Sequence, residues 1–261
     1  MKIFLNNKYF IDFFASVMFF TRIPIHWPYF SDKPPDLTRA TWSFPLVGFL
    51  IGIISGIVGE LCIYLNLPIF LSCTVAIGFS VMITGAFHED GLADMADGFG
   101  AGGSPEKINQ IMHDSRLGTY GMIALSLGLL IRLGIIMTLV DLGYSLVIIL
   151  STGFASGKLS ILFIRNFFNP SNFAKTGSII EYVPLKSLLI ACMLWFVIVV
   201  FFFPLFGIFL GISLTALVIF KIGNMAKRNL GGISGDILGA TAFLTELAFM
   251  FGLIIYLSIK N

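Results

Sequence analysis

The sequence predicts an all-α fold, a polytopic membrane helix bundle of about seven transmembrane helices preceded by an N-terminal interfacial or re-entrant segment. Hydrophobic residues make up 57% of the chain and charged residues only 11%, whereas soluble domains carry about 25% charged residues. Several apolar runs also reach the roughly 20 residues that a helix needs to cross a hydrocarbon core of about 30 Å. We expect a single integral-membrane domain over residues 1–261.

The apolar runs place the helices in order along the chain. An aromatic, amphipathic stretch at residues 9–23 comes first, and it either lies in the membrane interface or enters the membrane. Prolines between residues 24 and 35 then mark a non-helical stretch. The spans predicted after it are residues 44–65, 68–87, 117–140, 144–164, 185–203, 204–222 and 237–259.

Basic residues set the predicted orientation, because Lys and Arg gather in the cytosolic loops of membrane proteins. With the N-terminus in the cytosol, fourteen of the sixteen Lys and Arg residues fall on that side, leaving Arg132 within a span and Lys260 outside. The long polar loops 89–116, 165–184 and 223–236 then share one face. We therefore expect a multi-pass protein of the cell (inner) membrane whose active site faces the cytosol.

Small residues predict close packing between helices. Gly48, Gly52 and Gly56 stand four residues apart on one span, and Gly207 and Gly211 do so on another. Such stripes pack either within one bundle or between two copies, so a homo-oligomer stays possible at this point. No block rich in Lys and Arg indicates a nucleic-acid partner.

The acidic run at residues 88–98 is the most informative stretch, since four of the chain's fourteen carboxylates lie there. Asp90, Asp94 and Asp97 share one helix face because they stand at i, i+4 and i+7. Carboxylates held so close repel one another unless a cation lies between them, and Mg²⁺ is typically held by a few carboxylates and a substrate's phosphate oxygens. We predict that these three bind metal, with Asp94 also catalytic and Glu89 a ligand, a support or a proton acceptor. The alternative is a solvated charge cluster.

A second motif occupies residues 113–121, after a short helix that Ser104 and Pro105 are expected to open. Arg116 is suited to clamp a phosphate bidentately, and Ser115 beside it is a further predicted phosphate contact. Asp114 is a candidate metal ligand, a candidate support for Arg116 or a catalytic proton acceptor. The alternative is that Arg116 only anchors the topology.

A third motif is a glycine-rich turn before the last span. Exposed N–H groups at a helix N-terminus favour an anion, so the predicted phosphate contacts here are Gly231, Gly232, Ser234 and Gly235. Asp236 is a candidate fourth metal ligand. Glycine-rich turns are common, and this signal gains weight because the topology brings the turn to the same face as the acidic helix.

Ionisable residues inside spans are also informative, because a charge in a bilayer costs free energy and is usually paired or functional. Glu246 is expected to pair with Arg132 as a structural ion pair. Lys158 lies about two turns from the cytosolic end of its span and is a candidate phosphate contact. Arg22, near the N-terminus, is one more cytosolic cation that is predicted to meet phosphate.

At these residues the chain resembles the cobalamin synthase family, the adenosylcobinamide-GDP ribazoletransferases. The resemblance is carried by FFTRIP at 19–24, HEDGLADMADG at 88–98, HDSRLGTYG at 113–121 and GGISGD at 231–236. It implies a Mg²⁺-dependent integral membrane enzyme that joins adenosylcobinamide-GDP to α-ribazole, or to α-ribazole 5′-phosphate, and releases GMP. Cleavage of a pyrophosphate agrees with the independent reading of the acidic helix as a metal site.

Two alternatives stay open from the residues alone. One is another metal-dependent membrane enzyme, such as a CDP-alcohol phosphotransferase or a prenyltransferase. The former would carry Arg after its DGxxA run, where this chain has Asp94, and the latter typically carries two acidic helices. The other alternative is a transporter, which would more often place its polar groups near the membrane midplane.

Overall fold

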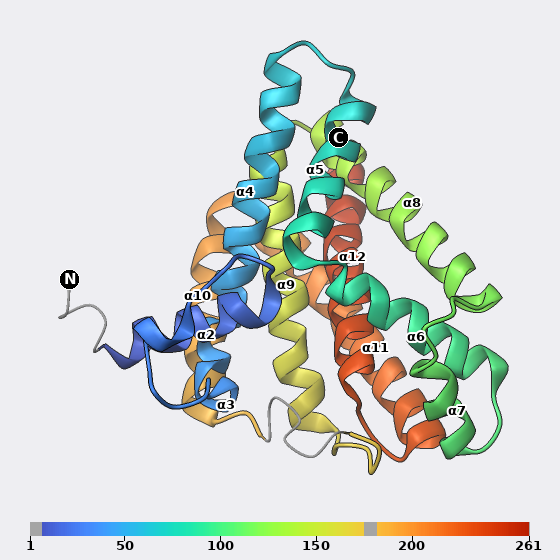
Figure 1. Cartoon of the computed structure of the whole chain (residues 1–261). Coiled ribbons are helices and arrows are strands. Elements are labelled where there is room, and N and C mark those ends of the chain that lie inside the picture. The colour runs from blue at the N-terminus through green and yellow to red at the C-terminus, as the bar shows by residue number, and fades with distance from the viewer. Residues whose placement is uncertain (1–6, 175–181, 261) are drawn as a thin grey trace.

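A computed structural model describes residues 7–174 and 182–260, and the described part is almost entirely helical (Figure 1). Two short 3₁₀ turns, η1 (Trp27–Tyr29) and η2 (Thr41–Ser43), interrupt the N-terminal region. The α-helices are α2 (Lys8–Phe20), α3 (Leu37–Ala40), α4 (Phe44–Tyr64), α5 (Ile69–Thr84), α6 (Phe87–Ala101), α7 (Pro105–Met112), α8 (Thr119–Asp141), α9 (Leu146–Phe167), α10 (Leu185–Phe202), α11 (Leu205–Leu230) and α12 (Gly235–Lys260).

The predicted all-α membrane bundle is confirmed. Within the described residues, six helices are long and apolar enough to cross a membrane, or up to seven if α5 and α6 count as one bent span. The predicted span at 68–87 corresponds to α5, which ends at Thr84, and α6 follows it at an angle of 87°. Gly85 and Ala86 make this break, both with a positive φ of 67° and 59°.

The bend sets the direction of the acidic helix. Because α6 is bent by 87° from α5, the two helices do not form one straight membrane-crossing helix. In Figure 1, α6 extends sideways from the foot of α5, between α8 and α12, with α7 below it. The left-handed conformation costs a residue with a Cβ roughly 1–2 kcal/mol, so the strain at Ala86 is retained where the chain must turn sharply.

Helix α9 forms the centre of the bundle, and most of its residues are buried. It packs along α4 through the stripe of Gly48, Gly52 and Gly56, where an added Cβ would overlap the backbone of α9. Gly211 likewise lies against Gly252 and Phe249 of α12. Both small-residue stripes therefore serve packing within this bundle, one of the two uses that the sequence allows.

Helix α2 lies beside the bundle rather than across the membrane. Its 13 residues extend about 20 Å, which is less than the ~30 Å of a hydrocarbon core. Its buried Asp12 accepts a hydrogen bond from Arg39 Nε at 2.6 Å, and Ser16 donates to the Ala40 carbonyl. These contacts attach α2 to the α3 and η2 region that precedes α4.

Candidate active site

Helix α6 packs against the start of α12 through Gly91, beside its acidic face. Glu89 and Asp90 lie in the first turn of α6, where the helix dipole favours negative charge. Gly91 allows the two helices to approach closely, because a Cβ there would lie 2.6 Å from the backbone oxygen of Asp236. Asp90 is exposed and Asp94 is half-buried, so both carboxylates are accessible to solvent.

Three carboxylates lie around Asp94. The pKa of the Asp94 carboxyl is raised to about 7, first by burial and then by the charges of Asp90, Asp236 and Asp97, while His113 opposes the shift. The structure thus brings Asp236, from the third motif, next to the acidic helix of the first. A carboxylate that resists ionisation among three others is stabilised as an anion when a cation lies beside it.

A hard divalent cation such as Mg²⁺ is bound by oxygen ligands, which carboxylates supply. Among the described residues, no group of three His, Cys, Asp or Glu side chains forms a ready-made cage. Mg²⁺ is usually held by one or two carboxylates, several waters and substrate phosphates rather than by an all-protein cage. Asp90, Asp94 and Asp236, half-buried or exposed and close enough to repel, fit such an incomplete site.

Asp97 has a different position from Asp90 and Asp94. It is buried, and its two oxygens accept hydrogen bonds of 2.8 Å from the backbone N–H groups of Gly118 and Gly121. Asp97 therefore caps the N-terminus of α8, where a carboxylate satisfies orphan donors and meets the positive end of the helix dipole. Capping α8 is sufficient reason for a carboxylate at this position. The structure therefore offers an alternative to the predicted role of Asp97 as a metal ligand.

The second motif forms an exposed turn between α7 and α8. As predicted, Ser104 caps α7 and Pro105 begins it. Asp114 and Arg116 pair at 2.8 Å, and the guanidinium of Arg116 holds the pKa of the Asp114 carboxyl below its usual range. The Arg116 side chain is 88% exposed, so it is free to meet a substrate.

The first two motifs share a cavity of ≈ 350 Å³ at the C-terminal end of α6. Asp97 lines it together with Asp114 and Arg116. Ser115 is exposed in the same turn. Tyr120 packs over Gly100 and also lines this cavity, a residue that the sequence reasoning missed and that only its place inside the HDSRLGTYG run signals.

The glycine-rich turn has clear structural tasks. Gly231 ends α11 with φ of 72°, and Gly232 lies so close to Asn169 and Pro170 that an added Cβ would overlap them. The Ser234 hydroxyl accepts a long hydrogen bond of 3.5 Å from the Ile237 N–H in the first turn of α12. Of the predicted phosphate contacts in this turn, Gly231 and Gly235 are exposed, and Ser234 and Gly235 line one small cavity.

That small cavity, of ≈ 50 Å³, joins the third motif to the N-terminal one. Phe19 and Phe20, which precede Arg22 in the FFTRIP run, line it with Phe87 at the start of α6 and Arg165 of α9. Arg165 was not predicted, because a basic residue at the cytosolic end of a span is ordinary. The FFTRIP run, the start of α6 and the glycine-rich turn are far apart in the sequence, and they meet at one end of the bundle.

Arg22 lies over the break between α5 and α6. It is exposed, its backbone N–H donates to the Ile83 carbonyl at 2.7 Å, and its side chain covers Gly85. A Cβ at Gly85 would overlap the guanidinium. Arg22 thus supplies a cation close to the N-terminal end of the acidic helix, where the sequence predicts a phosphate contact.

Glu89 points away from the acidic face. It accepts a hydrogen bond of 2.7 Å from Arg132 Nη1, while Arg132 Nη2 donates to Glu246 at 2.8 Å, and all three side chains are buried. The predicted pairing of Arg132 with Glu246 is confirmed, and Glu89 is the third member that sequence reasoning missed. In this position Glu89 joins α6 to α8 and α12 instead of facing a metal or a substrate hydroxyl.

Lys158 is also inside the bundle. Its side chain is 2% exposed, and its Nζ lies 5.3 Å from the ring centroid of Phe20 and 5.4 Å from that of Phe154. A phosphate would have to enter the helix core to reach it, so the structure does not support the predicted phosphate contact. A lysine in mid-helix can face either way, and the sequence could not tell that this one faces inward.

Comparison with known proteins gives one consistent result. The family model of cobalamin-5-phosphate synthase matches residues 12–254. An adenosylcobinamide-GDP ribazoletransferase from Azorhizobium caulinodans is 33% identical over 261 residues, which cover 96% of this chain and 98% of the relative. Relatives of the same description from Shewanella frigidimarina (36%, 90% of each chain) and Clostridium botulinum strain Kyoto (35%, 92% of this chain and 95% of the relative) are also similar. No solved structure matches.

Proposed function

The chain belongs to the cobalamin-5-phosphate synthase family, and from this premise we propose how its acidic face carries out the reaction. The protein is an adenosylcobinamide-GDP ribazoletransferase of cobalamin biosynthesis. It joins adenosylcobinamide-GDP to α-ribazole or α-ribazole 5′-phosphate and releases GMP. This activity takes the place of the CDP-alcohol phosphotransferase, prenyltransferase and transporter alternatives.

The reaction breaks a phosphoanhydride bond of the pyrophosphate and forms a phosphate ester. A ribose hydroxyl oxygen of α-ribazole attacks the phosphorus that carries the cobinamide, the bond from that phosphorus to the bridging oxygen breaks, and GMP leaves with the electron pair. The attacking hydroxyl loses its proton. The protein therefore has to bind the charged pyrophosphate, orient the two reactants in line and accept one proton.

We assign Mg²⁺ binding to Asp90, Asp94 and Asp236. The observation that carries this assignment is the cluster of carboxylates around Asp94, where burial and the neighbouring charges together raise the pKa of Asp94 to about 7. A bound Mg²⁺ would supply charge neutralisation at the pyrophosphate oxygens. Asp97 supports the site from the side by fixing the start of α8.

Arg116 binds the substrate phosphate in this proposal. Its guanidinium is exposed and offers donors in a fixed fork that matches phosphate oxygens. Asp114 orients it through hydrogen bonds to Nε and Nη2 at 3.2 Å and 2.8 Å. Asp114 is paired with Arg116, and Glu89 is paired with Arg132. We therefore assign proton acceptance to the remaining carboxylates of the acidic face, Asp94 foremost.

We also propose that this face is cytosolic and that the protein lies in the inner membrane. Lys and Arg residues cluster in the loops that share the side of α6 and α7, as cytosolic loops do. Adenosylcobinamide-GDP carries a charged pyrophosphate, which favours an active site open to water rather than to lipid. A homo-oligomer stays a prediction from the sequence.

Release of GMP by the purified full-length protein in lipid vesicles tests the proposal. The assay supplies adenosylcobinamide-GDP, α-ribazole and Mg²⁺, with EDTA in a parallel sample. We expect GMP and the cobalamin product in equal amounts, and neither in EDTA. Equal rates with and without EDTA would contradict the metal assignment alone, whereas absence of GMP from a folded sample would contradict the activity itself.

A further inference from the structure

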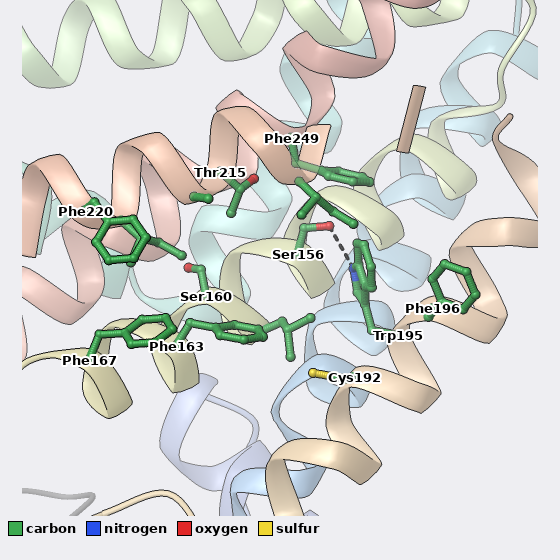
Figure 2. A pocket seen from close by; sticks show the side chains of 14 residues that line it. Ser156, Ser160, Phe163, Phe167, Cys192, Trp195, Phe196, Thr215, Phe220 and Phe249 are labelled. Atoms are coloured by element: carbon green, nitrogen blue, oxygen red, sulfur yellow. Dashed lines mark hydrogen bonds between the residues drawn. The ribbon is translucent and has the colours of Figure 1, made fainter. Parts of the chain in front are cut away.

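A large apolar pocket lies on the far side of α12 from the acidic helix. It has a volume of ≈ 490 Å³ and is bounded by α9, α10 and α11, with Phe249 of α12 closing its inner wall. Figure 2 shows its elongated form, with Phe167 and Phe220 at one end and Trp195 and Phe249 at the other. This volume falls within the range of about 300–1,000 Å³ that is usual for ligand pockets.

The walls of the pocket are almost entirely apolar or aromatic, and most of the hydroxyl groups in them are already paired. Ser156 accepts a hydrogen bond of 2.9 Å from Trp195 Nε1, and Ser160 bonds Thr245 at 2.6 Å. Neither the lining nor these closed pairs offers a binding group to a phosphate or a nucleotide. The chemistry of the walls therefore selects a hydrocarbon ligand.

The pocket opens onto the lipid-facing surface of the bundle. Large apolar side chains at its rim are about half exposed: Phe196 is 44%, Ile212 45% and Phe220 48% exposed. These residues lie on α10 and α11, two of the candidate membrane spans. The rim is therefore continuous with the surface that contacts lipid chains, and hydrocarbon is the solvent at its mouth.

One hydroxyl in the pocket has no hydrogen-bond partner among the described residues. Thr215 Oγ1 is buried and unpaired, although a threonine inside a helix can usually bond the carbonyl four residues earlier. A buried hydroxyl without a partner costs about 1–3 kcal/mol. An acceptor on a ligand, such as an ester carbonyl near the head of an acyl chain, would satisfy it.

We propose that this pocket is a binding site for one acyl chain of a membrane phospholipid. Its lining on α9 runs from Ser156 to Phe167, twelve residues that extend about 16 Å along the helix, so the site suits a long, narrow chain. The proposal does not depend on the reaction assigned to α6, because α12 separates the two sites.

Occupation of the pocket bears on the rest of the bundle through α9 and α12. Ser156 lies two residues from Lys158, and Phe249 lies three residues from Glu246, so pocket and buried charges share these two helices. A chain in the pocket supplies the packing contacts that α9, α10 and α11 lack toward one another there. Lipid removal is therefore expected to loosen the packing of α9, α10 and α11 against α12, the helix that also contacts α6.

A matched pair of variants tests the site. Ala216→Trp places an indole in the pocket wall, and Leu217→Trp places the same group on the neighbouring residue, which is 66% exposed and does not line the pocket. The full-length protein is reconstituted with a phosphatidylcholine that carries a diazirine on one acyl chain. After illumination, mass spectrometry locates the labelled residues.

In the unchanged protein we expect labels to concentrate on pocket residues such as Phe163, Cys192 and Thr215. Ala216→Trp should lower this labelling about tenfold, and Leu217→Trp should leave it unchanged. Equal labelling in both variants, or labels spread evenly over the exposed residues, would overturn the proposal. So would protection of the pocket by a second copy, detected as cross-links between protomers. Thermal unfolding in detergent verifies that both variants fold.

Discussion

The two faces of α6 differ more than their sequence suggests. Glu89 and Asp90 are neighbours in the chain, yet Glu89 is buried in an ion pair with Arg132, while Asp90 is exposed beside Asp94. The inner face joins α6 to α8 and α12, and the outer face is left to ligands. The comparison teaches that a dense acidic motif is not one site: some of its charges hold the helix, and others are accessible, and to these we assign the chemistry.

The largest expected effect is on the outer face. Asp94→Asn removes a charge from the crowded carboxylates and should lower the rate of GMP release about a thousandfold, without changing the temperature of unfolding. Glu106→Gln, an exposed carboxylate on α7 outside this face, is the matched control and should keep full activity. Near-normal turnover in Asp94→Asn would remove the distinction between the faces.

On the inner face, Arg132→Met should act on stability. It leaves Glu89 and Glu246 buried without their cation, which typically costs about 3–5 kcal/mol. Thermal unfolding in detergent should show a large decrease in midpoint, and Arg132→Lys, which keeps the charge, should restore part of it. An Arg132→Met protein as stable as the original would show that the ion pairs do not hold α6.

Substitutions in the second motif should change activity and not stability, like substitutions on the outer face of α6. Arg116→Ala should lower kcat/KM about tenfold to a hundredfold, because a hydrogen bond to a charged group contributes about 1.5–3 kcal/mol. Its stability should not change, since exposed ion pairs contribute little. Arg116→Lys keeps the charge but loses the fork, so it should recover activity only in part. Loss of folding in Arg116→Ala would instead indicate a structural role.

Asp97 offers the sharpest test of the comparison, with the smallest expected change. If its main task is to cap α8, Asp97→Asn keeps an oxygen that accepts a backbone hydrogen bond and should retain most activity. Asp97→Ala should destabilise the protein by about 1 kcal/mol. If Asp97→Asn instead abolishes turnover at unchanged stability, Asp97 belongs to the metal site with Asp94.

The sequence predicts the helices of this protein well because their signals are local. Apolar length sets the spans, and Ser104 with Pro105 marks the start of α7. The period of Asp90, Asp94 and Asp97 places them on one helix, but it does not distinguish a carboxylate that caps α8 from one that is open.

The parts that the sequence did not reveal depend on distant contacts. Glu89 and Arg132 are 43 residues apart, and the inward direction of Lys158 depends on its neighbours Phe20 and Phe154. The break between α5 and α6 had a visible glycine at Gly85, but the positive φ of Ala86 has no signal in an alanine. The apolar pocket likewise depends on how α9, α10 and α11 are spaced.

The order of synthesis gives the buried ion pair a further meaning. A ribosome makes Glu89 first, Arg132 43 residues later and Glu246 another 114 residues after that. At elongation rates of about 5–20 residues per second, Glu89 lacks its partner Arg132 for roughly 2–9 seconds, and Glu246 completes the group about 6–23 seconds later. We expect α6 to stay solvated at the membrane surface until α8 and α12 have inserted. A chain that stalls before α12 would then be both inactive and recognisable to the proteases that remove incomplete membrane proteins.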